Sequence, residues 1–221
     1  RRVPHPVLIG HAASLSQAVK LENDNQEVER ARTLLEKARA QAGTERVWMK
    51  SVILERDAGN LDAAKKLLTE ALGKFPAFAK LWMILVQSYE AQGDQEAARK
   101  AYMDGTAKCP NAIDLWVVAA KFEKTAGQIT KARSLLERAR LKNPKNPVLW
   151  LESVRLEFTT DNKKLAATRL SQALQECPSS GVLWSDAIIM EPRQQRKAKS
   201  TDAIRACESD PHLIMTVAPP P

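Results

Sequence analysis

Hydrophobic residues along the chain are spaced as in pairs of amphipathic helices. Within residues 61–74 the apolar side chains recur three or four positions apart, which puts one apolar stripe on a helix. Those residues are Ala64, Leu67, Leu68, Ala71 and Leu72. An earlier apolar segment around Trp48 is separated from this one by Gly59-Asn60, a turn-forming pair. The pattern predicts a hairpin of two helices.

The same hairpin recurs every 34 residues. All five tryptophans keep this interval: Trp48, Trp82, Trp116, Trp150 and Trp184. A glutamate stands seven residues after four of them: Glu55, Glu123, Glu157 and Glu191. A proline follows 28 residues after each of the first four: Pro76, Pro110, Pro144 and Pro178. A fixed period of this length indicates a helical repeat in which each unit buries its apolar face against its neighbours.

We therefore expect an all-α, right-handed superhelical solenoid of about six helix-turn-helix repeats. Two helices of roughly 14 residues and two short turns account for one period. Residues 1–11 are expected to form an irregular leading segment, and residues 213–221 the truncated start of a further repeat. The expected units are about 12–43, 44–78, 79–112, 113–145, 146–180 and 181–212.

Three units depart from the pattern. In the first, Leu15 stands in place of the tryptophan and Gly43 in place of the proline, and in the third, Tyr89 replaces the glutamate. In the sixth, Pro192 should end the first helix early, because proline within a helix costs about 3 kcal/mol or more. The second helix of that unit is then expected near residues 195–208.

The repeated tryptophans and glutamates are interpreted as structural. A tryptophan can also stack on a nucleic-acid base, but each one here lies on the apolar stripe beside Leu or Val, which favours packing in the core. Whole repeats separate the glutamates, whereas a catalytic carboxylate pair needs about 5–10 Å. We expect these glutamates to form hydrogen bonds or salt bridges between layers.

The chain is mildly basic. Its 221 residues carry a net charge of +8, with 17 basic and 14 acidic residues in the first 110 and 17 and 12 in the rest. This balance is compatible with RNA or an acidic protein as partner. The densest basic run offers a candidate polyanion contact at Arg193, Arg196, Lys197 and Lys199. A solvated helix face is the favoured interpretation of that run.

The sequence gives no support for an enzyme, a cofactor or a metal site. It has no glycine-rich phosphate loop and no G-x-S-x-G motif, and its three histidines, His5, His11 and His212, lie near the ends. The three cysteines do not form a disulfide framework, which favours a reducing compartment. No apolar run approaches the ~20 residues of a membrane span. The chain does not begin with methionine, and we expect it to be a fragment of a longer protein.

The repeat resembles the half-a-tetratricopeptide (HAT) repeat. The features that carry the resemblance are Leu-Trp in the first helix, the late glutamate, the Ala-Arg-rich second helix and the final proline, and residues 115–144 show all of them. The repeat departs from a standard tetratricopeptide unit at the Leu-Gly and Tyr positions of the first helix. Proteins of the HAT class act in RNA processing, mostly as assembly scaffolds.

Longer segments are similar to the pre-mRNA-processing factor 6 family of U5 snRNP proteins. They include ENDNQEVERARTLLEKAR at 22–39, RLKNPKNPVLWLESVRLEF at 140–158 and RQQRKAKSTDAIRACESDPH at 193–212. This resemblance implies a nuclear, non-catalytic scaffold that bridges U5 and U4/U6 components in the spliceosomal tri-snRNP. The implied partners are other snRNP proteins, with indirect or weak RNA contact and no membrane or small-molecule substrate.

Two further functions remain open. The chain could bind RNA directly through basic helix faces, in which case affinity should fall steeply with salt. It could also self-associate through an exposed end of the repeat array.

Overall fold

The computed structural model describes residues 28–207, and in that range every regular element is a helix. The expected irregular leading segment, the first helix of the first repeat and the truncated last repeat lie outside the described residues. The helices are α2 (Val28–Ala42), α3 (Glu45–Asp57), α4 (Leu61–Lys74), α5 (Ala79–Ala91), α6 (Gln95–Lys108), α7 (Ile113–Thr125), α8 (Ile129–Lys142), α9 (Pro147–Thr159), α10 (Lys163–Glu176), α11 (Gly181–Met190) and α12 (Arg193–Ala206).

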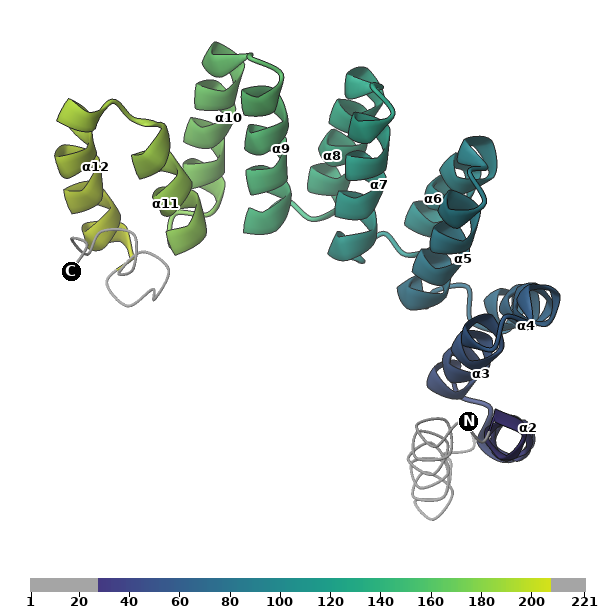
Figure 1. Cartoon of the computed structure of the whole chain (residues 1–221). Helices are drawn as coiled ribbons and strands as arrows, with labels where there is room; N and C mark the ends of the chain where they lie inside the picture. Colours follow the sequence, from purple (N-terminus) through teal and green to yellow (C-terminus); the bar gives the residue numbers. More distant parts are fainter. Residues whose placement is uncertain (1–27, 208–221) are drawn as a thin grey trace. The chain divides into compact units, whose positions relative to one another are not determined.

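The chain forms two compact units, one ending at Cys109 and the other beginning at Pro110. Within the first, α3 pairs with α4 and α5 with α6, and α2 packs on α3. Within the second, α7/α8, α9/α10 and α11/α12 are antiparallel hairpins that follow one another (Figure 1). The expected all-α fold of repeated helical hairpins is confirmed.

Each turn inside a hairpin uses one residue with a positive φ. The value is 80° at Gly59, 73° at Gly93, 74° at Gly127 and 60° at Asp161. These positions are 34 residues apart, and glycine or a short polar residue is what the left-handed conformation accepts at a helix end. The Gly and Asp turn signals in the sequence therefore mark the true boundary between the two helices.

The second helix of a hairpin ends at a residue held outside the helical region. Phe75, Cys109, Asn143 and Cys177 have φ between −135° and −123° and ψ of 61–66°. Each precedes a repeat proline, and the proline ring disfavours the α conformation of the residue before it. The backbone N–H of each still donates to the carbonyl four residues earlier, which closes the last turn.

A hydrogen bond ties each repeat tryptophan to a repeat proline. The indole N–H donates to the proline carbonyl six residues earlier, at 2.8 Å for Trp82, 3.0 Å for Trp116, 2.8 Å for Trp150 and 2.8 Å for Trp184. The carbonyl of Pro110 also accepts from the side-chain amide of Asn143, one repeat later, at 2.9 Å. The 28-residue interval thus reflects a direct contact, since the proline of one repeat receives the tryptophan of the next.

The indole rings differ in burial. Trp48, Trp116 and Trp150 are buried in hydrophobic clusters, with 5%, 3% and 8% of their surface exposed. Trp82 and Trp184 are only partly buried. Three of the five rings therefore fill core positions, and the other two are anchored by their hydrogen bonds at the edge of the packing.

The last hairpin is irregular because of Pro192. α11 has 10 residues where the other first helices have 13. Pro192, with φ −55° and ψ 145°, stands before α12, which begins at Arg193 rather than near residue 195. Proline is accepted just before a helix but not inside one. Ala203 is the only buried residue of α12, because the shortened α11 cannot cover the rest of it.

Truncating Trp116 tests this packing. We expect Trp116→Ala to lower the free energy of unfolding by about 3–5 kcal/mol, as for other large core truncations. Trp116→Phe keeps a ring and loses the hydrogen bond to Pro110, which should cost only about 1 kcal/mol. Urea denaturation measures both; equal losses for the two variants would contradict the buried position of the ring.

Candidate functional site

An arginine of one hairpin binds a buried glutamate of the next. Arg32 of α2 donates from Nε and Nη2 to the two carboxylate oxygens of Glu55 on α3, at 2.6 and 2.8 Å. Asn60 donates to the same carboxylate at 3.1 Å. Glu55 is 5% exposed. Two parallel charge-assisted hydrogen bonds are the strongest form of this pairing.

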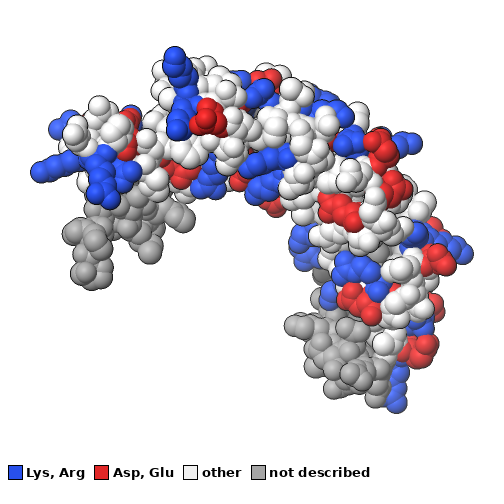
Figure 2. Space-filling view, turned by 45° about the horizontal axis from the view of Figure 1, so that its top comes forward, with Lys and Arg blue, Asp and Glu red and all other residues white. Residues whose placement is uncertain are grey.

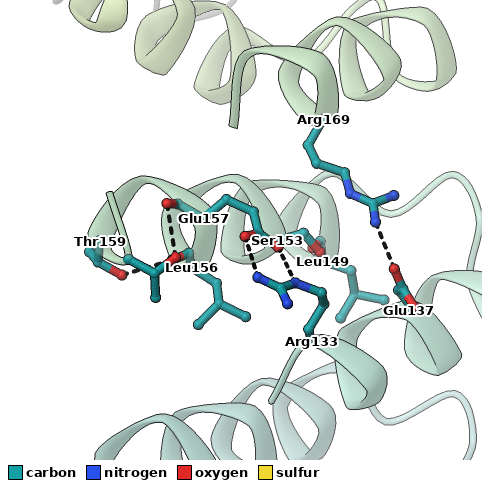
Figure 3. A network of polar contacts seen from close by, with 9 residues as sticks. Arg133, Glu137, Leu149, Ser153, Leu156, Glu157, Thr159 and Arg169 are labelled. Carbon is teal, nitrogen blue, oxygen red and sulfur yellow. Dashed lines mark hydrogen bonds and ion pairs between the residues drawn. The ribbon is translucent and has the colours of Figure 1, made fainter. Parts of the chain in front are cut away.

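The second unit repeats the arrangement between α8 and α9. Arg133 donates to both oxygens of Glu157, at 2.6 and 2.7 Å, and Glu157 is 2% exposed (Figure 3). A further ion pair joins Glu137 of α8 to Arg169 of α10 at 2.6 Å. Polar side chains, as well as apolar ones, therefore link consecutive hairpins.

A second arginine in each of these helices lies over a tryptophan. The guanidinium of Arg39 is 5.4 Å from the ring centroid of Trp48, and that of Arg140 is 4.2 Å from that of Trp150. At these distances a cation is attracted to the face of the ring. Each arginine lies seven residues after the arginine that binds the glutamate.

We call each set of four residues a double-arginine clamp. The two arginines are two helical turns apart, and so are the tryptophan and the glutamate that they contact. Because consecutive helices run antiparallel, the earlier arginine meets the later partner. One clamp consists of Arg32, Arg39, Trp48 and Glu55, and the other of Arg133, Arg140, Trp150 and Glu157.

Other junctions lack the clamp because both of its sides change together. Between α4 and α5, Lys65 and Leu72 take the arginine positions and Tyr89 takes that of the glutamate. Lys65 instead donates to Gln92 at 3.0 Å. The sequence contains this signal in the paired motifs ARTLLEKAR and ARSLLERAR, but the arginines and glutamates must be considered together, 23 or 24 residues apart, to find it.

The remaining predicted glutamates lie elsewhere. Glu123 is buried on α7, with 4% exposed. Glu191 follows the end of α11, partly exposed, with its carboxylate 3.8 Å from Lys199. The early end of α11 at Pro192 thus takes Glu191 out of the helix.

Burial and pairing set the charge state of the clamp. The pKa of Glu55 and that of Glu157 are lowered, mainly because the paired arginine donates two hydrogen bonds to each carboxylate. The pKa of Arg133 is raised by the same bond. Burial, and then the nearby charge of Arg169, lowers the pKa of Arg140. The Nε of Arg140 is buried and has no hydrogen-bond partner among the described residues.

The predicted basic run divides into two kinds of residue. Arg196 donates to the carbonyls of Glu191 and Ile189, at 2.9 and 3.0 Å, and Lys199 lies 5.8 Å from the ring centroid of Trp184. Both therefore stabilise the α11–α12 turn. Arg193 and Lys197 are exposed and remain available to solvent or a partner.

The first helices of the second unit form a charged groove. Ala120, Leu136 and Leu156 line its floor, and its rim consists of Lys121, Lys124, Glu152 and Arg155. Lys121 lies 3.4 Å from Glu152, so one cation–carboxylate pair crosses the groove from α7 to α9.

Two features extend this face of α9. Arg155 contacts Asp186 of α11 through two nitrogen–oxygen pairs, at 3.1 and 3.4 Å. Phe158, three residues after Arg155, is 48% exposed. Residues three apart share a helix face, so an exposed aromatic ring stands beside the groove.

Metal and membrane sites have no counterpart in the described part of the chain. Among residues 28–207, no three His, Cys, Asp or Glu side chains are grouped as metal ligands. Cys109, Cys177 and Cys207 are free and buried. None of the described helices has the length and apolar character needed to cross a bilayer.

Family models match the middle of the chain. Residues 50–113 and residues 113–156 each match a tetratricopeptide repeat model. Similar solved structures include the C-terminal part of a TPR repeat-containing protein from Cytophaga hutchinsonii, with TM-score 0.58, 10% identity and coverage of 94% of this chain and 88% of that one. PilF of Pseudomonas aeruginosa gives TM-score 0.53 and 12% identity, over 94% and 97% of the two chains. These structures share the fold.

A relative with clear sequence identity is Protein STABILIZED1 of Arabidopsis thaliana. The two are 59% identical over 54 residues, which make up 24% of this chain. The match spans only 5% of the length of the plant protein.

The tetratricopeptide matches change one expectation. In the repeat that begins at Ala79, Trp82, Leu85 and Tyr89 fit the Trp-x2-Leu-Gly-x2-Tyr pattern, with Val86 in place of its glycine. The expected departure from a standard tetratricopeptide unit at the Leu and Tyr positions is therefore wrong for this repeat. Assignment to the HAT subclass stays a prediction.

The clamp should make the protein sensitive to acid. A lowered carboxylate pKa gives stability that is present above its ordinary value of 4.5 and is lost as pH falls through the folded value. We expect the free energy of unfolding to decline from about pH 5 downward, and Glu157→Gln to decline less steeply. Exposed Glu70 supplies the control variant Glu70→Gln, which should keep the wild-type slope in urea titrations at several pH values.

The two arginines of a clamp should differ in importance. Arg133→Met leaves the buried Glu157 charge unpaired and should cost about 3–5 kcal/mol. Arg140→Met removes a buried guanidinium that has an unsatisfied Nε and keeps an apolar contact with Trp150, so the change should stay within about 1 kcal/mol. Denaturation curves compare the two; an equal or larger loss for Arg140→Met would be contrary to this assignment.

Proposed function

We propose that this chain is a non-catalytic scaffold of pre-mRNA splicing that bridges U5 and U4/U6 components of the tri-snRNP through protein–protein contacts. The implied setting is the nucleus, and the implied partners are other snRNP proteins. Tetratricopeptide repeats serve as protein-interaction scaffolds, which supports the general part of the proposal. The segments similar to the pre-mRNA-processing factor 6 family support the specific part.

The groove between α7 and α9 is the observation that carries the scaffold function. Its apolar floor is open to solvent, and three of its four charged rim residues are cations. Phe158 adds an exposed apolar surface on the same helix. An extended polypeptide with both acidic and apolar side chains complements this combination, since the cations give orientation and the apolar contacts give affinity.

The clamps support the same function by keeping the groove in shape. Arg133 and Glu157 join α8 to α9 directly beneath the helices that line the groove. A groove whose two walls are held by buried bidentate bonds does not have to be ordered when a partner binds. Such preorganisation reduces the entropy that binding loses.

Cross-linking with purified U5 and U4/U6 snRNP proteins tests the proposal. We expect cross-links from Lys121 and Lys124 to specific snRNP proteins, and a drop of at least about tenfold in affinity for the variant Lys124→Glu/Phe158→Ser. The control variant Lys100→Glu/Met103→Ser makes the same chemical changes on exposed positions of α6 and should bind normally.

Two results would count against the scaffold. One is equal binding by the groove variant and the wild-type chain. The other is capture of free small nuclear RNA together with none of the purified proteins.

A further inference from the structure

Basic residues of the second unit are concentrated in the second helix of each hairpin. α8, α10 and α12 contain five, three and five Lys or Arg, and one acidic residue each. The first helices α7, α9 and α11 contain two, one and none, against two, two and one acidic residues. The excess of positive charge, which appears even when the halves of the chain are compared, is thus uneven at the level of helices.

Five of these thirteen cations are engaged within the chain. Arg133 and Arg169 form ion pairs, Arg140 lies on Trp150, and Arg196 and Lys199 hold the α11–α12 turn. Among the others, a group near the start of the three helices is fully on the surface. This group, which we call the basic edge, consists of Lys131, Lys163, Lys164, Arg193 and Lys197.

The basic edge lies along one side of the second unit. The three second helices all begin on the same side of their hairpins (Figure 1), and Figure 2 turns that side toward the viewer, where Lys and Arg side chains are prominent. The acidic neighbour Asp161 lies 3.6 Å from Lys163, and both side chains are largely exposed, at 88% and 75%. One exposed carboxylate cannot neutralise five exposed cations.

Helix stability does not explain these positions. Cations close to a helix start are unfavourable by about 0.3–1 kcal/mol, because the peptide dipoles already make that end positive. In the first unit, α2, α4 and α6 carry an acidic residue in the first turn, as stability requires. α8, α10 and α12 carry none. The cations of the basic edge therefore oppose the stability of their own helices, which indicates selection for an external anion.

We propose that the basic edge binds the sugar-phosphate backbone of a nucleic-acid duplex. A duplex presents closely spaced negative charges that several cations on adjacent helices can contact together. The exposed neighbours Thr130, Gln194 and Gln195 are hydrogen-bond donors of the kind that bind phosphate oxygens. Leu165, at 36% exposed, is the one large apolar side chain in these first turns, so an amphipathic peptide finds little to bury there.

A duplex fits better than a single strand. Single-stranded binding relies on aromatic side chains that stack on unpaired bases. Within the first turns of α8, α10 and α12 there is no aromatic residue. The bases of a duplex are already stacked, so phosphate contact alone is enough. The basic edge is also separate from the groove of the first helices, and it goes beyond the proposed scaffold function.

Salt-dependent binding of a fluorescent RNA duplex of about 20 base pairs measures these contacts. With five phosphate contacts, the logarithm of the binding constant should fall with the logarithm of salt concentration with a slope of about −4 to −5. The variant Lys131→Gln/Lys163→Gln/Lys164→Gln should bind at least tenfold more weakly and reduce the slope by about 2–3.

A matched control has the same change in net charge. Lys66→Gln/Lys100→Gln/Lys108→Gln alters exposed lysines on second helices of the first unit and should leave affinity and slope unchanged. Equal losses for the two triple variants would overturn the proposal, because net charge alone would then explain binding. Circular-dichroism melting of all variants verifies that each is folded.

Two competing ligands complete the test. Tighter binding of single-stranded RNA, or equal binding of polyglutamate with the same sensitivity to the basic-edge variant, would overturn the assignment to a duplex backbone. The groove variant Lys124→Glu/Phe158→Ser should bind the duplex normally. Loss of protein partners with retained duplex binding, or the reverse, therefore separates failure of this proposal from failure of the scaffold function.

Discussion

The bond between a buried glutamate and an arginine of the preceding hairpin is the constraint on which the packing within each unit depends. A carboxylate that is only 2% exposed, such as that of Glu157, cannot stay ionised at low free-energy cost without a partner. Its partner, Arg133, belongs to the neighbouring repeat. The charge of one hairpin is therefore stabilised only when the next hairpin is folded against it, which couples consecutive repeats more tightly than apolar contact alone.

The clamp also determines which cations are available for other roles. Arg32, Arg39, Arg133 and Arg140 are used between helices, so a simple count of basic residues overestimates the charge offered to a partner. What remains in the second unit is divided between two places. Lys121, Lys124 and Arg155 surround a groove suited to a peptide, and the basic edge faces outward from the second helices.

The fold could be predicted from the sequence because its signals are local and periodic. Gly59, Gly93 and Gly127 mark turns, and the 28-residue interval between tryptophan and proline reflects a hydrogen bond such as that of Trp116 to Pro110. The clamp could not be predicted from the glutamates alone, because each partner lies 23 or 24 residues earlier in a different repeat. The basic run was likewise incomplete as a site, since Arg196 folds back on Glu191 while Lys131 and Lys163 come from other hairpins.

The pKa of the Glu157 carboxyl group, measured by carbon-13 NMR titration of the native chain, tests the clamp most directly. The account predicts a pKa below the ordinary value of 4.5, because Arg133 donates two hydrogen bonds to the carboxylate. Burial alone would raise it. A measured pKa at or above the ordinary value would contradict the clamp, and with it the coupling between repeats.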